Sequence, residues 1–487
     1  MTEPTIFELS SPGRVGVRFP ETDVPLSDLP ESFMRTDLPL PELSELDVVR
    51  HFTHLSALNY CIDKGFYPLG SCTMKSNPKI NEEIARLPGF ALTHPHQPIT
   101  TIQGNLALMY DLQEILKEIS GFAAVTLEPS AGAQGELTGV LIMSAYHRSK
   151  NDEKRTKILI PDSAHGTNPA TSAMGGFEVV HLNSDARGNV DLNHLRELCD
   201  ETTAGLMLTN PNTLGLFDEN VEEVVKVVHE AGGLVYGDGA NLNALLGIVK
   251  PGELGFDIMH FNLHKTLSTP HGGGGPGSGP VGVCTQLAEF LPTPLIGILE
   301  PATDSLPPLF GFITPQKTVG RVKSFFGQFG MLVRAYTYIR MHGPEGLKKI
   351  SEYAVLNANY LLALIKGTYK LSFERSCMHE FVLEGKWADV PDVHALDIAK
   401  RLMDYNFHPP TNYFPLIVQE ALMIEPTETE SKQTLDAFAQ ALLAIAREAR
   451  ETPELLKEAP HTTPIGRLDE VKAAKELVLC CWLPDTK

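Results

Sequence analysis

The amino-acid sequence predicts an α/β fold, with a mostly parallel sheet in a large domain and a smaller α/β domain toward the carboxyl end. The main observation is that short apolar runs alternate with helical patterns between about residues 115 and 330. These runs are almost continuously hydrophobic, which is typical of parallel strands covered on both faces. Beyond residue 330 the chain carries long helical patterns and only a few short strands, which favours a separate, smaller domain.

The expected strands of the large sheet are six apolar, β-rich runs. They lie at 157–163, 177–183, 204–212, 233–241, 256–265 and 279–285. Residues 220–233 have apolar side chains at helical spacing and end in Gly232-Gly233, as expected of a helix that covers the sheet. Ligands bind at the carboxyl ends of the strands in sheets of this kind, so polar residues at those ends are candidates for a site.

Four parts of the chain are expected from these patterns. They are an N-terminal arm or extension (1–115), a large domain (116–330), a small C-terminal domain (331–450) and a C-terminal extension (451–487). The small domain is predicted to contain a long helix broken near Gly343-Pro344 and a second amphipathic helix, with two short strands between them. The helices lie at 332–365 and 431–450, and the strands at 379–385 and 414–426.

The composition is that of an ordinary soluble protein, and it limits the kinds of partner. The chain has 487 residues, 43% of them hydrophobic, and a formal net charge of −20, so we expect neither nucleic acid nor membrane as a partner. No apolar run approaches the roughly 20 residues that span a membrane. The beginning, "MTEPTIFELS", lacks the apolar core of a secretory signal. Seven scattered cysteines indicate reduced thiols, and we expect a cytoplasmic protein.

The first candidate site is the run "EPSAGAQGELTGV", where small residues lead into a helix. Backbone N–H groups over 131–136 would bind a phosphate there, although the same pattern fits an ordinary tight turn capped by Ser130 or Glu136. His165 follows a strand and would stack on a flat ring, or it is a plain surface histidine. Asn210, Asn212 and Thr213 follow the next strand and would hydrogen-bond a ligand, or they form an Asx turn.

Two charged residues end apolar strands, where each needs a partner. Asp238 ends "GLVYGDGAN", and burying its carboxylate without a partner would be costly. Lys265 ends "FDIMHFNLHK", and desolvation there would lower its pKa toward the neutral amine that attacks a carbonyl. Together with the 131–136 turn and His165, these residues meet the needs of pyridoxal 5'-phosphate, held as a covalent Schiff base at Lys265. The combination predicts the aspartate-aminotransferase-like fold, pyridoxal-phosphate fold type I.

Other classes of site fit the sequence less well. "GGGGPGSG" contains a G-x-G-x-x-G match, but it leads into a strand instead of a helix, which argues against a dinucleotide loop. His94 and His96 have no third ligand at a supporting spacing, so no metal is expected. A non-catalytic scaffold subunit is the remaining alternative, and the context of Lys265 argues against it.

Several longer motifs resemble one family, the P-protein of the glycine cleavage system (glycine dehydrogenase, decarboxylating). They are "YPLGSCTMKSNPKIN", "SAHGTNPATSAMGG", "TNPNTLGLF", "DGANLNALLG", "NLHKTLSTPHGGGGPGSGPVGV" and "ALMIEPTETES". The resemblance runs from about residue 40 to 475. The length and the lysine motif are similar to subunit 2 of the two-chain form of this family.

The resemblance also implies roles for individual residues. Lys265 would carry the cofactor with His264 beside it, Asp238 would hold the pyridinium nitrogen, and His165 would stack on the ring. The residues implied to contact the cofactor or lie near it are Ala133, Gln134, Ala240, Thr213, Ser71 and Cys72. Lys265, His264 and His165 would be the catalytic residues.

The activity that the resemblance implies is the oxidoreductase activity of an aminomethyl-transferring glycine dehydrogenase. Glycine would lose CO2, and its aminomethyl group would pass to the lipoyl arm of the H-protein. The implied assembly is a heterotetramer of two copies of this chain and two of subunit 1. Another pyridoxal-phosphate amino-acid decarboxylase or lyase remains the alternative. The glycines of 272–280 are expected either to leave room for the lipoyl arm or to form a structural turn.

Overall fold

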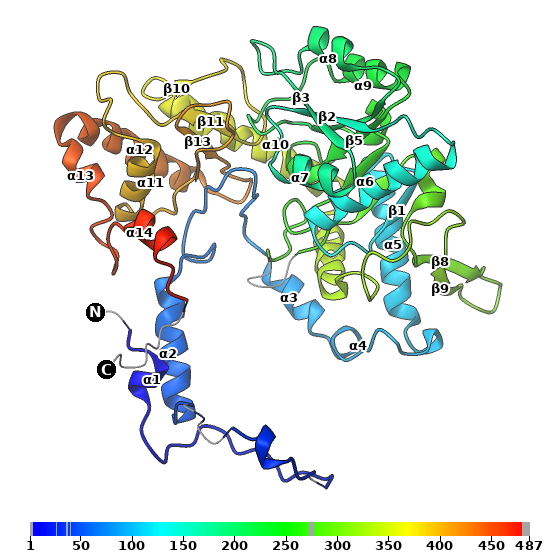
Figure 1. Ribbon diagram of the computed structural model, residues 1–487, viewed down its shortest axis with the longest axis horizontal. Coiled ribbons are helices and arrows are strands. Elements are labelled where there is room, and N and C mark those ends of the chain that lie inside the picture. Colours follow the sequence, from blue (N-terminus) through cyan, green and yellow to red (C-terminus); the bar gives the residue numbers. More distant parts are fainter. Residues whose placement is uncertain (1–2, 26, 36–37, 39, 272–276, 480–487) are drawn as a thin grey trace. The chain divides into compact units, whose positions relative to one another are not determined.

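The computed structural model describes residues 3–25, 27–35, 38, 40–271 and 277–479 and divides into two compact units. The smaller unit comprises residues 1–65 and 461–487, and the larger unit comprises residues 66–460. The elements of the smaller unit include α1 (Ile6–Leu9), a 3-10 turn (Glu31–Phe33), α2 (Glu45–Leu58) and α14 (Glu470–Lys475) (Figure 1). The domain boundaries predicted at residues 115, 330 and 450 stay predictions.

A seven-stranded sheet forms the centre of one half of the larger unit. Its strands are β1 (Ala124–Thr126), β2 (Lys157–Pro161), β3 (Glu178–Leu182), β4 (Thr203–Thr209), β5 (Leu234–Asp238), β6 (Ile258–His260) and β7 (Val281–Val283). The spatial order is β1-β7-β6-β5-β4-β2-β3, and β7 alone pairs antiparallel with its neighbours. The expectation of a mostly parallel sheet, with strands at the six predicted runs, is confirmed.

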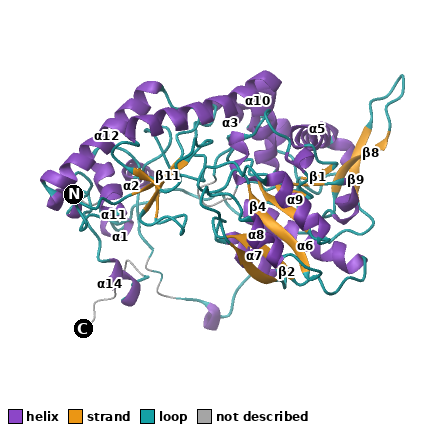
Figure 2. Ribbon diagram, turned by 90° about the horizontal axis from the view of Figure 1, so that it is seen from above, coloured by secondary structure: helices purple, strands orange, loops and turns teal. Residues whose placement is uncertain are grey.

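Both faces of this sheet are buried, because alternate residues of each strand enter different hydrophobic clusters. In β2, Leu159 packs into one cluster, with residues of α5 and α9, while Ile158 and Ile160 pack into another, with residues of α6. Helices α6 and α9 lie beside the strands in Figure 2. Coverage on both sides explains why the strands are apolar throughout. The helices of this half are α5 (Gln103–Ser120), α6 (Gly132–Ser149), α7 (Thr167–Met174), α8 (Leu192–Leu198) and α9 (Val221–Glu230).

A four-stranded antiparallel sheet forms the centre of the other half. Its order is β10-β11-β13-β12, with bounds Lys370–Leu371, Phe381–Glu384, Ala421–Ile424 and Thr411–Asn412. The helices that pack with it are the second half of α10 (Phe329–Ile365), α11 (Ala395–Asp404), α12 (Lys432–Glu451) and α13 (Pro453–Lys457). The predicted break in the long helix is confirmed, because Gly343 has φ 63° and ψ 179° immediately before Pro344.

Three further segments complete the larger unit. Helices α3 (Lys79–Ala85) and α4 (Pro88–Ala91) precede α5, and a hairpin of β8 (Leu295–Glu300) and β9 (Leu309–Ile313) follows β7. The hairpin is not among the predicted strands. Gly297 and Gly311 face each other in its register, and Pro-rich sequence joins its strands, so it lacks a clear strand pattern.

Candidate active site

The predicted site residues meet at one edge of the seven-stranded sheet. Strands β2, β4, β5 and β6 are parallel, and β1 runs in the same direction as β6 because both pair antiparallel with β7. Their carboxyl ends therefore lie at the same edge. From these ends the chain continues into the start of α6, His165, Thr213, Asp238 and Lys265.

Asp238, the last residue of β5, is a buried carboxylate with 5% exposure. Its oxygens accept hydrogen bonds from Ala240 N–H at 3.0 Å and from Nδ2 of Asn168 at 3.4 Å, and His260 Nε2 lies 3.5 Å away. Burial alone would raise the pKa of Asp238, but His260, Lys265 and the Ala240 N–H outweigh it, and the pKa is lowered. The carboxylate is therefore ionised, while both of its hydrogen-bond donors are neutral.

Lys265 lies in a turn after β6, and its Nζ donates a hydrogen bond to the Ser71 carbonyl oxygen at 2.6 Å. Ser71 is far from Lys265 in sequence, so this contact brings the predicted arm motif to the lysine. Cys72 lies next to it, and its carbonyl oxygen is 2.7 Å from Nε2 of His271. Burial raises the pKa of the Cys72 thiol, although the charge of Lys265 opposes that effect, so the thiol is protonated at neutral pH.

His165 is exposed in the loop that follows β2, and the buried carboxyl group of Glu136 lies near it. Thr167 Oγ1 is 2.9 Å from His165 Nδ1 and donates a hydrogen bond to Glu136 at 2.9 Å. Burial, and after it the charge of Asp238, raises the pKa of Glu136 to about 7. The two carboxyl groups therefore differ in protonation. Asp238 is ionised, whereas Glu136 is protonated at moderately acid pH.

Helix α6 begins within the 131–136 run, which the sequence predicts as a phosphate-binding turn. Its N-cap Ala131 provides no side-chain cap, and Ala133 is exposed in the first turn. The Gln134 side chain instead closes the turn: its Oε1 accepts a hydrogen bond from Ser130 N–H at 2.7 Å and its amide donates to the Val322 carbonyl. Any contribution of Gln134 to an anion site therefore comes from its backbone N–H.

Three other predicted residues have clear local roles. Ala240 binds Asp238 through its N–H, and the buried Thr213 hydroxyl donates to the Ser163 carbonyl oxygen. His264 turns toward the chain after the glycine run, where its Nδ1 accepts a hydrogen bond from Ser278 N–H at 3.3 Å. Burial and the neighbouring His271 lower the pKa of His264 to about 3, so its ring is neutral.

Several ionisable residues that interact with the charge of Lys265 are not among the predicted site residues, among them Glu136, His260, Glu380 and Glu425. Each has a signal in the sequence. His260 interrupts an apolar strand, Glu136 begins a helix, and the two other glutamates flank the apolar strands of the small sheet. The rule that located Asp238, a polar residue at the end of an apolar strand, applies equally to Glu380 and Glu425.

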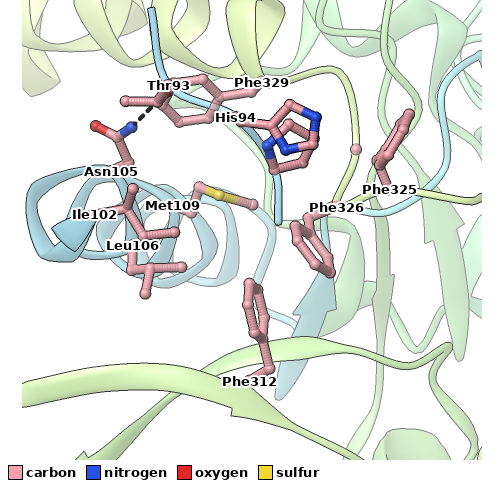
Figure 3. Close-up of a pocket in the computed structure, with 12 residues that line it drawn as sticks. Thr93, His94, Ile102, Asn105, Leu106, Met109, Phe312, Phe325, Phe326 and Phe329 are labelled. Atoms are coloured by element: carbon pink, nitrogen blue, oxygen red, sulfur yellow. Dashed lines mark hydrogen bonds between the residues drawn. The ribbon is translucent and has the colours of Figure 1, made fainter. Parts of the chain in front are cut away.

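A separate cavity of about 160 Å³ lies among α5, the segment before α5 and the segment before α10. Figure 3 shows Phe312, Phe325, Phe326 and Phe329 around it, with Met109 of α5. His94 also lines this cavity and lies 5.6 Å from His96, ring centre to ring centre. The cavity is predominantly apolar, unlike the edge of the sheet at Lys265.

Some predictions fall on residues that the structure does not describe. Gly272 to Gly275, with Pro276, lie outside the described residues, as do Cys480 and Cys481. The described part of the glycine run begins at Gly277, where the backbone packs closely against the site. An added Cβ at Gly277 would lie 2.1 Å from Nδ1 of His264, and one at Gly279 would lie 2.0 Å from the Ala131 carbonyl oxygen. Glycine at these two positions allows close approach to the site.

The residues at this edge fit pyridoxal phosphate. The cofactor requires an amine, a carboxylate for its ring nitrogen and an anion site. Lys265 supplies the amine, ionised Asp238 accepts its hydrogen bonds from the neutral donors Ala240 and Asn168, and α6 begins without a side-chain cap. An added Cβ at Gly132 would lie 2.3 Å from Asn262 Oδ1, so the start of α6 has room only for glycine.

Comparisons with known proteins agree on the class. Residues 137–274 match the family model of aminotransferase class-V, and residues 350–461 match that of the glycine dehydrogenase C-terminal domain. A crystal structure of glycine decarboxylase (P-protein) of the glycine cleavage system, in inhibitor-bound form, aligns with a TM-score of 0.72 and 21% identity, over 86% of this chain and 93% of that one. Glutamate decarboxylase of Lactobacillus brevis aligns with a TM-score of 0.63 and 13% identity, over 88% and 96%.

The fold and the site thus define a protein of the aminotransferase class-V fold, a pyridoxal-phosphate-dependent fold class, and the predicted fold class is confirmed. The sequence relatives are more specific. A probable glycine dehydrogenase (decarboxylating) subunit 2 of Caldanaerobacter subterraneus is 58% identical over 97% of this chain and 98% of its own length, and that of Halalkalibacterium halodurans is 57% identical over 97% of both. The chain belongs to the family of glycine dehydrogenase (decarboxylating) subunit 2, and the predicted resemblance is confirmed.

Proposed function

We propose that this chain catalyses the pyridoxal-phosphate-dependent decarboxylation of glycine as the cofactor-binding subunit of a glycine dehydrogenase (decarboxylating), an oxidoreductase of the glycine cleavage system. The observation that carries the proposal is the meeting of Lys265, Asp238 and the uncapped start of α6 at one edge of the sheet, in a chain of this family. CO2 is released, and the aminomethyl group passes to the lipoyl arm of a carrier protein, the H-protein.

Each residue at the edge has a distinct task in this proposal. Lys265 would hold the cofactor covalently, as a Schiff base, and Asp238, by remaining ionised, would favour protonation of the ring nitrogen. The backbone N–H groups of Ala133 and Gln134 bind the phosphate, and His165 covers the ring. When bound, pyridoxal phosphate supplies an electron sink for the electron pair that CO2 leaves behind.

Two histidines beside Lys265 are candidates for proton movement. His264 is neutral, with Nδ1 accepting from Ser278 N–H, so the hydrogen of the ring is on Nε2. Burial lowers the pKa of His271 as well, and its Nε2 hydrogen-bonds the Cys72 carbonyl. His264 therefore cannot take up a proton at Nε2, which already carries the ring hydrogen, and in this proposal it acts as a hydrogen-bond donor through that atom.

The partners in this proposal are a subunit 1 chain, two of each forming a heterotetramer, and a lipoylated H-protein. The designation of the relatives as subunit 2 supports a partner subunit. Across the described residues, none of the helices combines the length and hydrophobicity that crossing a membrane requires. We place the assembly in the cytoplasm.

The test is the exchange of labelled CO2 into the carboxyl group of glycine, measured with and without the lipoylated carrier protein and the partner subunit. We expect exchange with glycine that rises strongly when both proteins are present. The principal alternative is another amino-acid decarboxylase or lyase, because glutamate decarboxylase and a sphingosine-1-phosphate lyase share this fold. Activity toward other amino acids, with no response to the carrier, would favour that alternative.

The second alternative is a scaffold subunit without catalysis, and a simpler measurement separates it. The protein, supplied with pyridoxal phosphate and its partner subunit, is expected to be yellow, and borohydride reduction is expected to fix the cofactor on the peptide that contains Lys265. A colourless protein under these conditions would contradict catalysis by this chain.

A further inference from the structure

The segment around Ser71 is anchored to the small sheet in a strained conformation. Leu69 forms an isolated bridge with Ile424, the last residue of β13. Ser71 and Thr73 both have left-handed backbones, with φ 59° and 49°, which non-glycine residues rarely adopt. Such conformations persist only where their surroundings hold them, so the contacts of these two residues identify what holds the loop.

Two buried glutamates provide those contacts. Glu380 Oε2 accepts a hydrogen bond from Ser71 N–H at 2.6 Å, and the Ser71 hydroxyl lies 3.1 Å from Oε1. Glu425 binds Thr73 in the same way, accepting from its N–H at 2.8 Å and from its hydroxyl at 2.6 Å. Each carboxylate therefore fixes one left-handed residue through both its backbone and its side chain. With Ser71 fixed in this way, its carbonyl oxygen accepts the hydrogen bond of Lys265.

The two glutamates lie opposite each other at one end of the small sheet. Phe381 pairs with Ile424 in the antiparallel register of β11 and β13, so the next residues outward are Glu380 and Glu425. Both have 0% exposure, and their carboxylates lie within 4.8 Å of each other. Two carboxylates this close and this deeply buried cannot both be charged without a large cost, so a proton is retained between them.

The groups around the pair agree with one shared proton. Burial, and then Glu425, raises the pKa of Glu380 to about 8, and burial also raises the pKa of Glu425. His379 Nε2 lies 3.8 Å from Glu425, but neither of its ring nitrogens makes a hydrogen bond, and burial lowers its pKa to about 3. The other ionisable groups that interact with the pair are Lys265, Cys72, His271, the buried Cys377 and Glu428, the last paired with Lys75 at 2.7 Å.

We propose that Glu380 and Glu425 act together as positioning residues for Lys265. They hold the Ser71 carbonyl oxygen where it accepts a hydrogen bond from the lysine amine, and they carry one negative charge between them that stabilises the protonated form of that amine. This proposal rests on the proposed function of Lys265 as the cofactor lysine. It gives the lysine a defined partner whenever its amine is not bound to the cofactor.

The charge is tested by measuring the rate at which acetic anhydride labels Lys265 at pH 7, in the full-length chain without pyridoxal phosphate or glycine, with mass spectrometry of its peptide. At this pH the pair still holds its proton, because the pKa of Glu380 is about 8. Glutamine mimics a protonated glutamate, so Glu380→Gln and Glu425→Gln alone should leave the labelling rate unchanged, whereas the double variant should raise it about tenfold or more. Glu384→Gln, on the same strand but bound to Lys370 and Ser372, is the matched control and should leave it unchanged.

Faster labelling at pH 7 in both single variants would overturn the shared proton, and so would a stoichiometric metal ion in the purified chain. An unchanged labelling rate in a double variant that keeps its far-ultraviolet circular dichroism would overturn the electrostatic role. These readouts involve no turnover, so a failure to exchange CO2 with glycine would count against the proposed function alone.

The positioning role has its own readout, the rate at which Lys265 captures added pyridoxal phosphate, followed by visible absorbance. Glu380→Ala leaves Glu425 charged but removes the contacts to Ser71, so capture should be slower than in the wild type. Glu380→Gln retains an oxygen that accepts from Ser71 N–H, so it should restore capture to near the wild-type rate. Equal rates in the alanine and glutamine variants would overturn the positioning role.

Discussion

Asp238 and Glu380 are both buried carboxylates next to the ends of strands, yet their protonation differs. The pKa of Asp238 is lowered, whereas that of Glu380 is raised to about 8. Burial acts in the same direction on both and is the largest effect in each case. The difference comes from the neighbours, because Asp238 faces His260 and Lys265, while Glu380 faces a second carboxylate, Glu425.

This difference shows that burial alone does not assign a role to an acidic residue. The seven-stranded sheet places Asp238 among histidines and a lysine and so provides a negative charge for a cationic ligand. The four-stranded sheet places Glu380 and Glu425 opposite each other, so this pair keeps a proton. The hydrogen bonds of the two glutamates hold the loop that contains Ser71 and Thr73. Both carboxylate centres interact with the charge of Lys265. A substitution of this lysine should therefore affect both of them.

The largest effect is expected from Lys265→Ala, which removes the cation that the two carboxylate centres share. Glycine-dependent CO2 exchange should fall on the order of 10⁴-fold or more, the size typical of losing a covalent catalyst. Borohydride should no longer fix pyridoxal phosphate to the chain. The exposed Lys366 is a suitable control, since Lys366→Ala should keep both the exchange activity and the fixed cofactor.

A smaller effect, specific to the seven-stranded sheet, is expected from Asp238→Asn. Asparagine keeps the shape and still accepts a hydrogen bond from Ala240, but it cannot balance a protonated ring nitrogen. CO2 exchange should fall by about 100-fold or more, as for the loss of one electrostatic contact at a reacting group. Pyridoxal phosphate should still bind to Lys265 and be fixed by borohydride. Wild-type exchange by this variant would show that the charge of Asp238 has no part in the reaction.

The smallest effect concerns stability, where the two centres predict opposite pH dependence. The folded pKa of Glu380, about 8, lies above its ordinary 4.5, so the native chain keeps a proton that the unfolded chain releases, and stability falls as pH rises through that window. Asp238 has a lowered folded pKa, so its contribution is present above its ordinary value of 3.8 and is lost as pH falls below it.

Calorimetric melting between about pH 5.5 and 8.5 separates Glu380 from Asp238, which is ionised throughout that range, while Glu136, with a pKa of about 7, adds to the decline in the same direction. The wild-type melting temperature should fall with rising pH, and Glu380→Gln should flatten the decline. Glu384→Gln should run parallel to the wild type, since the pKa of Glu384 is lowered. An unchanged slope in Glu380→Gln would contradict the raised pKa of Glu380.

Local patterns in the sequence are enough to predict the fold class and to place candidate residues at the edge of the large sheet. Apolar runs of strand length, separated by helical patterns, require a sheet covered on both faces, and that requirement places Asp238 and Lys265 at the carboxyl ends of neighbouring strands. These patterns have a period of about two or four residues. They can be read without knowledge of distant contacts, which is why the six predicted strands of the large sheet, the helix break at Gly343 and the start of α6 agree with the structure, whereas the Gly- and Pro-containing β8–β9 hairpin was missed.

Local patterns do not reveal which distant residues share a site, because those contacts arise from folding. The contact of Ser71 with Lys265 spans 194 positions, and those of Ser71 with Glu380 and Thr73 with Glu425 span 309 and 352. No local period encodes such pairs, because the folding of one sheet against a loop from another part of the chain creates them. The protonation of Glu380 likewise depends first on its burial and then on its pairing with Glu425, and β11 and β13 must meet in register to bring the two glutamates together.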